Sequence, residues 1–140
     1  FYQRWTLALL SHTLPWLTLT AEGLDIKPSD NIEMLRALGR DPLFIKRTRV
    51  DTIWGLVNLM DDALAAAPKL RAKTLILYGD HDQVIKKQPT KMMLAALPGL
   101  AQPATSGQRL IRYKDGYHML LRDLQAENVW RDIAAWITGK

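Results

Sequence analysis

The spacing of hydrophobic residues along the chain follows two patterns, which change near residue 70. Before that point, apolar residues recur at the three-to-four-residue spacing of amphipathic helices. The pattern predicts helices over residues 2–13, from Ser29 to Gly39, and from Asp51 to Pro68. Serine and aspartate are favoured helix N-caps, and glycine and proline are typical helix ends. We therefore expect a first half made of helices.

After residue 70, short apolar runs alternate with helical segments. The run TLILY, residues 74–78, is too short for a helix and predicts a strand buried on both faces. A helix that ends at Pro98, a strand over residues 108–113 and a helix over residues 123–137 are expected to follow. The last helix should turn these side chains inward: Leu124, Val129, Trp130, Ile133, Ala134, Trp136 and Ile137. This alternation predicts an α/β fold with two parallel strands joined by a crossover.

Two parallel strands are too few to form a stable sheet, because independent stability needs about three strands or a partner surface. We therefore expect them to be the edge of a larger sheet whose other strands lie outside this chain. The first residue, Phe1, is not a methionine, and we expect translation to start upstream of it. An unpaired strand edge or an uncovered apolar face would let the isolated chain form a homodimer.

Composition excludes several classes of protein. With 48% hydrophobic residues the chain is not disordered, and its net charge of +5 arises in residues 71–140 without any dense basic block. Aromatic residues do not interleave with these charges, so we expect a solvated basic face and no nucleic-acid partner. Arg4, His12 and Pro15 interrupt the apolar N-terminal run, which therefore predicts no transmembrane segment. The absence of cysteine fits a cytoplasmic protein, and peripheral membrane attachment stays open.

Acidic and histidine side chains follow the ends of the two predicted strands. Asp80, His81 and Asp82 come directly after Gly79, and His118 lies five residues after the second strand. In open parallel sheets the carboxyl ends of the strands share one edge, where ligands bind. An aspartate that accepts a hydrogen bond from an imidazole fixes its tautomer and stabilises its cation. We therefore expect an acid–base pair at this edge.

Less specific interpretations fit the same kinds of residue. A strand-end aspartate commonly hydrogen-bonds its own loop, and a loop histidine can simply be exposed. Asp80, His81 and Asp82 carry groups that suit a divalent metal, but successive residues in an extended loop point to opposite sides, so we expect no metal site. Trp54 and Met60 could line a pocket for an acyl chain or form the ordinary core face of their helix.

The segments GDHDQVI and RYKDGYHMLL together resemble the C-terminal half of α/β-hydrolases, and most closely the lysophospholipase and monoacylglycerol lipase branch. The resemblance implies that residues 1–70 are a helical cap or lid segment. It also implies that residues 71–140 are the C-terminal βαβα part of the hydrolase core. By the same resemblance, Asp82 is the acid and His118 the base of a Ser-His-Asp triad, with Asp80 as the alternative acid.

The nucleophile of that family precedes the acid in a G-x-S-x-G motif. Ser11, Ser29 and Ser106 lie in no such motif, so the resemblance implies a serine outside this chain and a chain that is inactive alone. The parent protein is then expected to be a serine carboxylic-ester hydrolase for lipid-like esters, such as lysophospholipids or monoacylglycerols, without a cofactor. A dehalogenase, an epoxide hydrolase, an acyltransferase and a non-catalytic binding or interaction domain remain open.

Overall fold

A computed structural model of the chain describes residues 2–20, 23–101 and 103–139, and Phe1 lies outside them. The chain divides into two compact units, each built from two stretches of sequence. One comprises Phe1–Asp25 and Asp41–Ala66, and the other comprises Ile26–Arg40 and Ala67–Lys140. Residues 26–40 therefore group with the strands of the second half. The assignment of a cap to residues 1–70 and of a hydrolase core to residues 71–140 stays a prediction.

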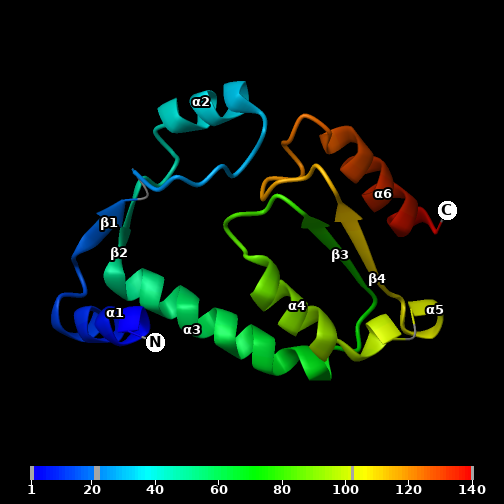
Figure 1. Cartoon of the computed structure of the whole chain (residues 1–140), viewed down its shortest axis with the longest axis horizontal. Helices are drawn as coiled ribbons and strands as arrows, with labels where there is room; N and C mark the ends of the chain where they lie inside the picture. The colour runs from blue at the N-terminus through cyan, green and yellow to red at the C-terminus, as the bar shows by residue number, and fades with distance from the viewer. Residues whose placement is uncertain (1, 21–22, 102, 140) are drawn as a thin grey trace. The chain divides into compact units, whose positions relative to one another are not determined.

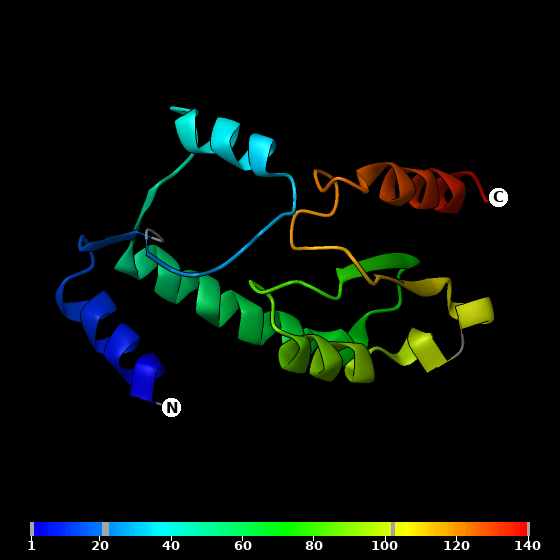
Figure 2. The same ribbon diagram turned by 45° about the horizontal axis from the view of Figure 1, so that its top comes forward.

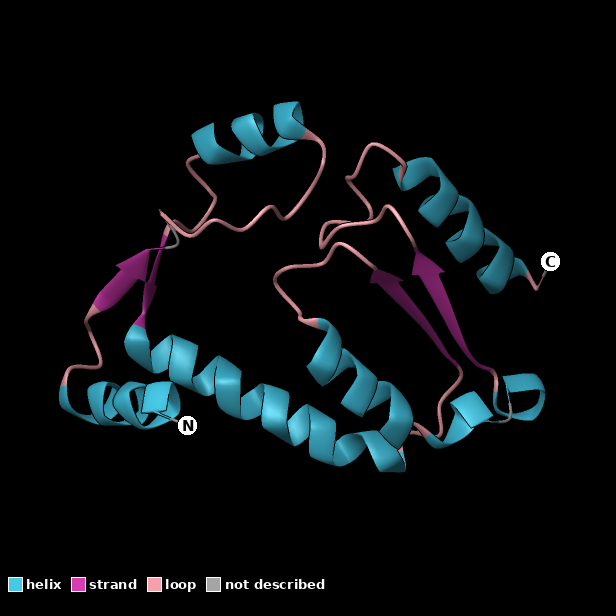
Figure 3. Cartoon of the chain, viewed as in Figure 1, coloured by secondary structure: helices cyan, strands magenta, loops and turns pink. Residues whose placement is uncertain are grey.

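The first unit combines two helices with a short β-ribbon (Figures 1 and 3). Helices α1 (Tyr2–Thr13) and α3 (Val50–Ala66) pack against each other. Strands β1 (Thr18–Thr20) and β2 (Arg47–Arg49) pair antiparallel. Hydrophobic spacing did not predict this ribbon, because three residues are too few to show a period of two. The amide of the buried Val50 donates to the carbonyl of Leu17 at 2.8 Å, which ties the ribbon to the start of α3.

The second unit is a two-stranded parallel sheet with a helix on each face (Figure 2). Strand β3 (Thr74–Gly79) pairs with β4 (Gln108–Tyr113) along its whole length, with Gly79 opposite Tyr113. Helix α4 (Lys87–Ala96) lies on one side of the strands and α6 (Ala126–Thr138) on the other. The predicted α/β architecture and the parallel strands are confirmed. The remaining elements are α2 (Ile32–Arg40), η1 (Ala67–Lys69), η2 (Pro98–Ala101) and α5 (Pro103–Ser106).

Two predictions about helix starts are wrong in detail. The cap of α2 is Asn31, whose Oδ1 accepts a hydrogen bond from the amide of Met34 at 3.1 Å. Ser29 lies two residues before that cap, where its Oγ accepts from the amide of Asn31 at 3.2 Å and its hydroxyl donates into a buried contact described below. Helix α3 begins at Val50, one residue before the predicted cap Asp51.

The burial predicted for the two central apolar segments is only partly correct. Residues 74–77 of β3 are half-buried, and only its last two residues are buried. In α6, Val129 is buried, but Trp130 and Ile137 are 54% and 69% exposed, and Leu124 is exposed before the helix begins. Hydrophobic spacing identifies which residues share a face and leaves open what covers that face. Within the described part of the chain, no helix is long and apolar enough to cross a membrane.

Candidate active site

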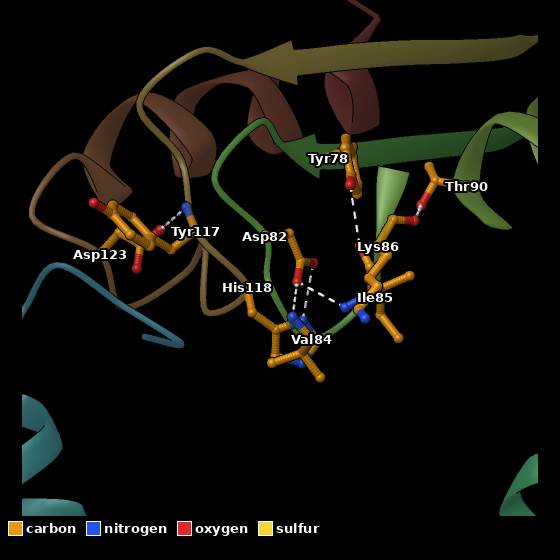
Figure 4. A network of polar contacts seen from close by, with 9 residues as sticks. All are labelled: Tyr78, Asp82, Val84, Ile85, Lys86, Thr90, Tyr117, His118 and Asp123. Atoms are coloured by element: carbon orange, nitrogen blue, oxygen red, sulfur yellow. Dashed lines mark hydrogen bonds and ion pairs between the residues drawn. The ribbon is translucent and has the colours of Figure 1, made fainter. Parts of the chain in front are cut away.

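Asp82 lies in a tight turn directly after β3, and its two carboxylate oxygens have different hydrogen-bond partners. The backbone amide of Asp82 donates to the carbonyl of Gly79 at 3.0 Å, which forms the turn. Oδ1 accepts hydrogen bonds from the amides of Val84 and Ile85, both at 2.8 Å (Figure 4). Only 8% of the side chain is exposed. The carboxylate is therefore held by its own loop in a fixed orientation, with Oδ2 left to face a second group.

That second group is His118, which comes from the loop after β4. Its Nδ1 lies 3.0 Å from Oδ2 of Asp82 (Figure 4). A carboxylate can only accept a hydrogen bond, so Nδ1 carries the proton and Nε2 is the nitrogen that can accept one. The imidazole is 39% exposed, whereas its carboxylate partner is nearly covered. An acid–base pair of this geometry can take a proton from a hydroxyl placed at Nε2 and return it later.

The two neighbours of Asp82 in the sequence have other partners. Asp80 pairs with Arg112 of β4, with Oδ1 2.6 Å from Nη2 and 3.1 Å from Nε. The ring of His81 meets the ring of Tyr117 edge-on, with centroids 5.2 Å apart. Three consecutive side chains thus point to three different groups, and the described residues contain no cluster of three ligands that could hold a metal ion. In this geometry Asp82, and not Asp80, contacts the imidazole.

The two loops that carry the pair touch through their backbones. The amide of Asp80 donates to the carbonyl of Tyr113, and the amide of His81 donates to the carbonyl of Gly116, both at 2.9 Å. Gly79 and Gly116 meet at this crossing, where neither has room for a side chain. These hydrogen bonds continue the pairing of β3 and β4 past the sheet, and they bring the acid and the base to the same edge.

Tyr113 anchors the start of the His118 loop, and this anchor predicts a pH effect. Its hydroxyl donates to Oδ2 of Asp132 at 2.7 Å. Burial, followed by the hydrogen bond and the negative charge of Asp132, raises the pKa of Tyr113 above its usual value near 10. The phenol should therefore stay protonated in the folded protein at a pH that ionises it in the unfolded chain. Its contribution to stability is complete below the unfolded pKa and is lost as pH rises through the folded one.

We expect Tyr113→Phe to lower the free energy of unfolding by about 1–2 kcal/mol at neutral pH, because Asp132 loses its donor. The difference in absorbance at 295 nm between wild type and variant, followed during alkaline titration, isolates the ionisation of this phenol. Half-ionisation below pH 10 would contradict the expectation.

None of the chain's three serine hydroxyls is directed at His118. Ser11 donates to the carbonyl of Ala8 within α1, and Ser106 donates to the carbonyl of Gly99, both at 2.7 Å. Ser29 donates to a carboxylate oxygen of Asp123 at 2.6 Å. Sequence reasoning assigned Ser29 to a helix cap and gave no role to Asp123, because no local pattern connects residues 94 positions apart.

The first unit contains a hollow of its own. A cavity of about 570 Å³ is lined by Arg4, Trp5, Ala8 and Trp54 on α1 and α3. Trp54, considered above as a pocket-lining or a core residue, is one of its walls, whereas Met60 is not among the lining residues. Arg4, which lines the cavity, lies over the ring of Trp54 and pairs with Asp61.

Comparison with known proteins gives one family match and several structural matches. The family model described as serine aminopeptidase, S33, matches residues 1–125. The structure of a monoacylglycerol lipase from Paleococcus ferrophilus superimposes with a TM-score of 0.82 at 22% identity, over 99% of this chain and 52% of that one. A soluble variant of monoglyceride lipase from Saccharomyces cerevisiae, solved with a substrate analogue, gives a TM-score of 0.76 at 17% identity, over 99% and 49%. The chain thus spans about half the length of these structures, and no curated protein matches it.

Proposed function

The chain belongs to the serine aminopeptidase S33 family of α/β-hydrolases, and from this premise we propose that it is the C-terminal half of a serine carboxylic-ester hydrolase for lipid-like esters. The observation that carries the proposal is the hydrogen bond of 3.0 Å between Asp82 and His118. The two residues are 36 positions apart and follow two neighbouring parallel strands. The acid follows the first strand and the base follows the second, in the order that the family's triad requires.

In the proposed mechanism the nucleophile is a serine in a segment outside residues 1–140. Nε2 of His118 takes the proton from the serine hydroxyl while the serine oxygen attacks the ester carbonyl. His118 then gives that proton to the leaving alcohol, and the acyl group stays on the serine. Water, deprotonated by the same nitrogen, releases the fatty acid and restores the serine. Asp82 holds the imidazole with Nε2 free to accept, and it stabilises the cation that forms after each proton transfer.

We propose a lipid-like ester, and not a peptide, as the substrate on the basis of two features. The neighbouring structures are those of monoacylglycerol and monoglyceride lipases, and the motifs around Asp82 and His118 resemble the same branch. The first unit also exposes large apolar side chains: Tyr2, Trp5, Leu9, Trp16, Leu56 and Leu59. Such surfaces suit contact with an acyl chain or a lipid aggregate. The proposal requires neither a metal nor a cofactor.

The test uses the full-length protein and residues 1–140 side by side. We expect the full-length protein to hydrolyse 1-monoacylglycerols or lysophospholipids and to be labelled by a fluorophosphonate, which reacts with activated serines. Residues 1–140 alone should show neither turnover nor labelling. Fluorophosphonate-sensitive hydrolysis by residues 1–140 would show that the nucleophile lies within the chain and would overturn the proposed triad.

Substrate profiling of the full-length protein separates the related chemistries. Aminoacyl anilides, short and long acyl esters, haloalkanes and epoxides test aminopeptidase, esterase, dehalogenase and epoxide hydrolase activity in turn. The proposal predicts the highest kcat/KM for an ester with a long acyl chain. A preference for the anilide would assign the same Asp82 and His118 to peptide hydrolysis.

A further inference from the structure

A short segment from the other half of the sequence bridges the two loops that carry the acid and the base. We define residues 27–31 as the brace. The amide of Lys27 donates to Oε1 of Gln83, beside Asp82, at 2.8 Å. The carbonyl of Pro28 accepts from the amide of Met119, beside His118, at 3.0 Å. The brace therefore contacts each loop at a position directly adjacent to one member of the pair.

The brace is attached most firmly at a buried serine–aspartate contact. Ser29 is 0% exposed and Asp123 is 5% exposed. The serine hydroxyl donates to Oδ1 of Asp123 at 2.6 Å. Oδ2 of the same carboxylate accepts from the amide of Tyr117 at 2.8 Å, and Figure 4 shows this second contact. Tyr117 directly precedes His118 in the chain. A buried carboxylate thus fixes the backbone from which the imidazole extends.

Further contacts on the far side of Asp123 complete the attachment. Asp30 accepts from the amide of Leu124 at 2.9 Å through its Oδ1, and Asn31 donates from Nδ2 to the carbonyl of Arg122 at 3.0 Å. The segment 117–124 is therefore bonded to the brace on both sides of the buried carboxylate. Because Asp123 is almost fully covered, its carboxylate depends on the Ser29 hydroxyl and the Tyr117 amide as donors, and a rearrangement that removed either one would be costly.

Neither Ser29 nor Asp123 supplies the side-chain cap of a nearby helix, although Oγ of Ser29 accepts from the amide of Asn31 at 3.2 Å. Asn31 caps α2, and α6 begins after Gln125 without a side-chain cap although an aspartate lies two residues earlier. The hydroxyl of Ser29 donates instead to Asp123, and the carboxylate of Asp123 accepts from the amide of Tyr117. Stability of the helices alone does not explain this arrangement, whereas placement of His118 does.

From these contacts we infer that Asp123 is a positioning residue, which, with Ser29, holds the His118 loop so that Nδ1 meets Asp82. The inference concerns the geometry of the pair, and its catalytic consequence rests on the proposed function. A displacement of about 1 Å in a catalytic group can lower the rate about 100-fold, so a fixed backbone at Tyr117 matters for turnover.

The direct test is the NMR signal of the His118 Nδ1 proton in the full-length protein labelled with ¹⁵N-histidine, with His118→Gln used for assignment. A persistent hydrogen bond to Asp82 protects this proton from exchange and gives a sharp downfield resonance. Asp123→Ala removes both carboxylate oxygens, so the hydroxyl of Ser29 and the amide of Tyr117 lose the acceptor that they share. We expect the resonance to be lost in this variant while far-UV circular dichroism is retained.

Gln108→Ala is the matched control. Gln108 is also buried, at 1% exposed, and it forms two hydrogen bonds through its side chain, to the amide of Gly99 and to the carbonyl of Leu70. It lies at the start of β4, the opposite end of the sheet from His118. We expect this variant to lose stability and to keep the resonance. Ser29→Ala, which leaves Oδ1 of the buried carboxylate without its donor, is the milder variant if Asp123→Ala does not fold, and it should weaken the resonance as well.

The outcomes separate the positioning role from the proposed function. Retention of the full resonance in Asp123→Ala, or in Ser29→Ala where that is the folded variant, would overturn the positioning role, as would its loss in Gln108→Ala. Absence of the signal in the wild type would show that the pair itself is not persistent, and would also overturn the role. If the enzyme is an esterase, kcat of Asp123→Ala should fall about 10–100-fold with KM nearly unchanged. If it is not, the NMR result still stands by itself.

Discussion

Asp82→Asn is expected to lower kcat/KM for ester hydrolysis by about 10⁴-fold in the full-length protein, with little loss of folding. The amide oxygen of asparagine can still accept from the amides of Val84 and Ile85, so the loop keeps its shape. Its amide nitrogen would then face His118 and donate to Nδ1. The imidazole would be held with its proton on Nε2, in the tautomer that cannot accept the serine proton.

Asp80→Asn is the matched control, because Asp80 leaves the same strand two residues earlier. Its carboxylate pairs with Arg112, whose side chain is largely exposed, and exposed pairs contribute little to stability. We expect kcat/KM of Asp80→Asn to stay within about fivefold of the wild type. Steady-state kinetics on one monoacylglycerol, with circular dichroism of each variant, are sufficient. Full activity in Asp82→Asn and loss of it in Asp80→Asn would reverse the proposed roles.

The sequence was sufficient to predict the two strands of the second unit, the helices α4 and α6 that follow them, and their order, but not the short helical turns η1, η2 and α5. The short apolar run before Gly79 and the alternating run QRLIRY are both strands, and they are parallel as expected. Two other features could not be predicted. The ribbon of β1 and β2 is too short to show a period, and the exposure of Trp130 depends on what packs against α6 rather than on the spacing within it.

The candidate site was predictable in its type and less so in its details. Parallel strands put their carboxyl ends at one edge, and this topology alone brings Asp82 and His118 together. The choice between Asp80 and Asp82 depends on side-chain direction, which local sequence does not give and which Arg112 decides in the structure. The buried contact between Ser29 and Asp123 joins distant segments, so no motif could have indicated it. The catalytic role of the pair stays a prediction.

Gly79→Ala is expected to destabilise the protein by about 3 kcal/mol or more, a large share of a typical total of 5–15 kcal/mol. A Cβ at this position would lie 2.4 Å from the carbonyl oxygen of Gly116 and 2.5 Å from that of Tyr117. Both are backbone atoms, so rotation of a side chain cannot relieve the overlap. Urea unfolding followed by circular dichroism measures the loss.

Gly39→Ala provides the control, because this glycine lies near the end of α2 and a Cβ there would meet nothing within 4 Å. Alanine is the better helix former, so this variant should gain up to about 1 kcal/mol. A free energy of unfolding for Gly79→Ala within 1 kcal/mol of the wild type would show that the two loops are not in close contact.

Gly79 also controls the geometry of the acid–base pair. Asp82 donates its amide to the carbonyl of Gly79, and the partner Gly116 lies in the loop that leads to His118. An alanine would have to separate the loops by roughly the size of a methyl group, and a hydrogen bond of 3.0 Å does not survive a shift of about 1 Å. At temperatures where Gly79→Ala remains folded, we therefore expect it to lose the His118 Nδ1–H resonance as well. Retention of that resonance in the folded variant would mean that the loops can separate without moving the pair.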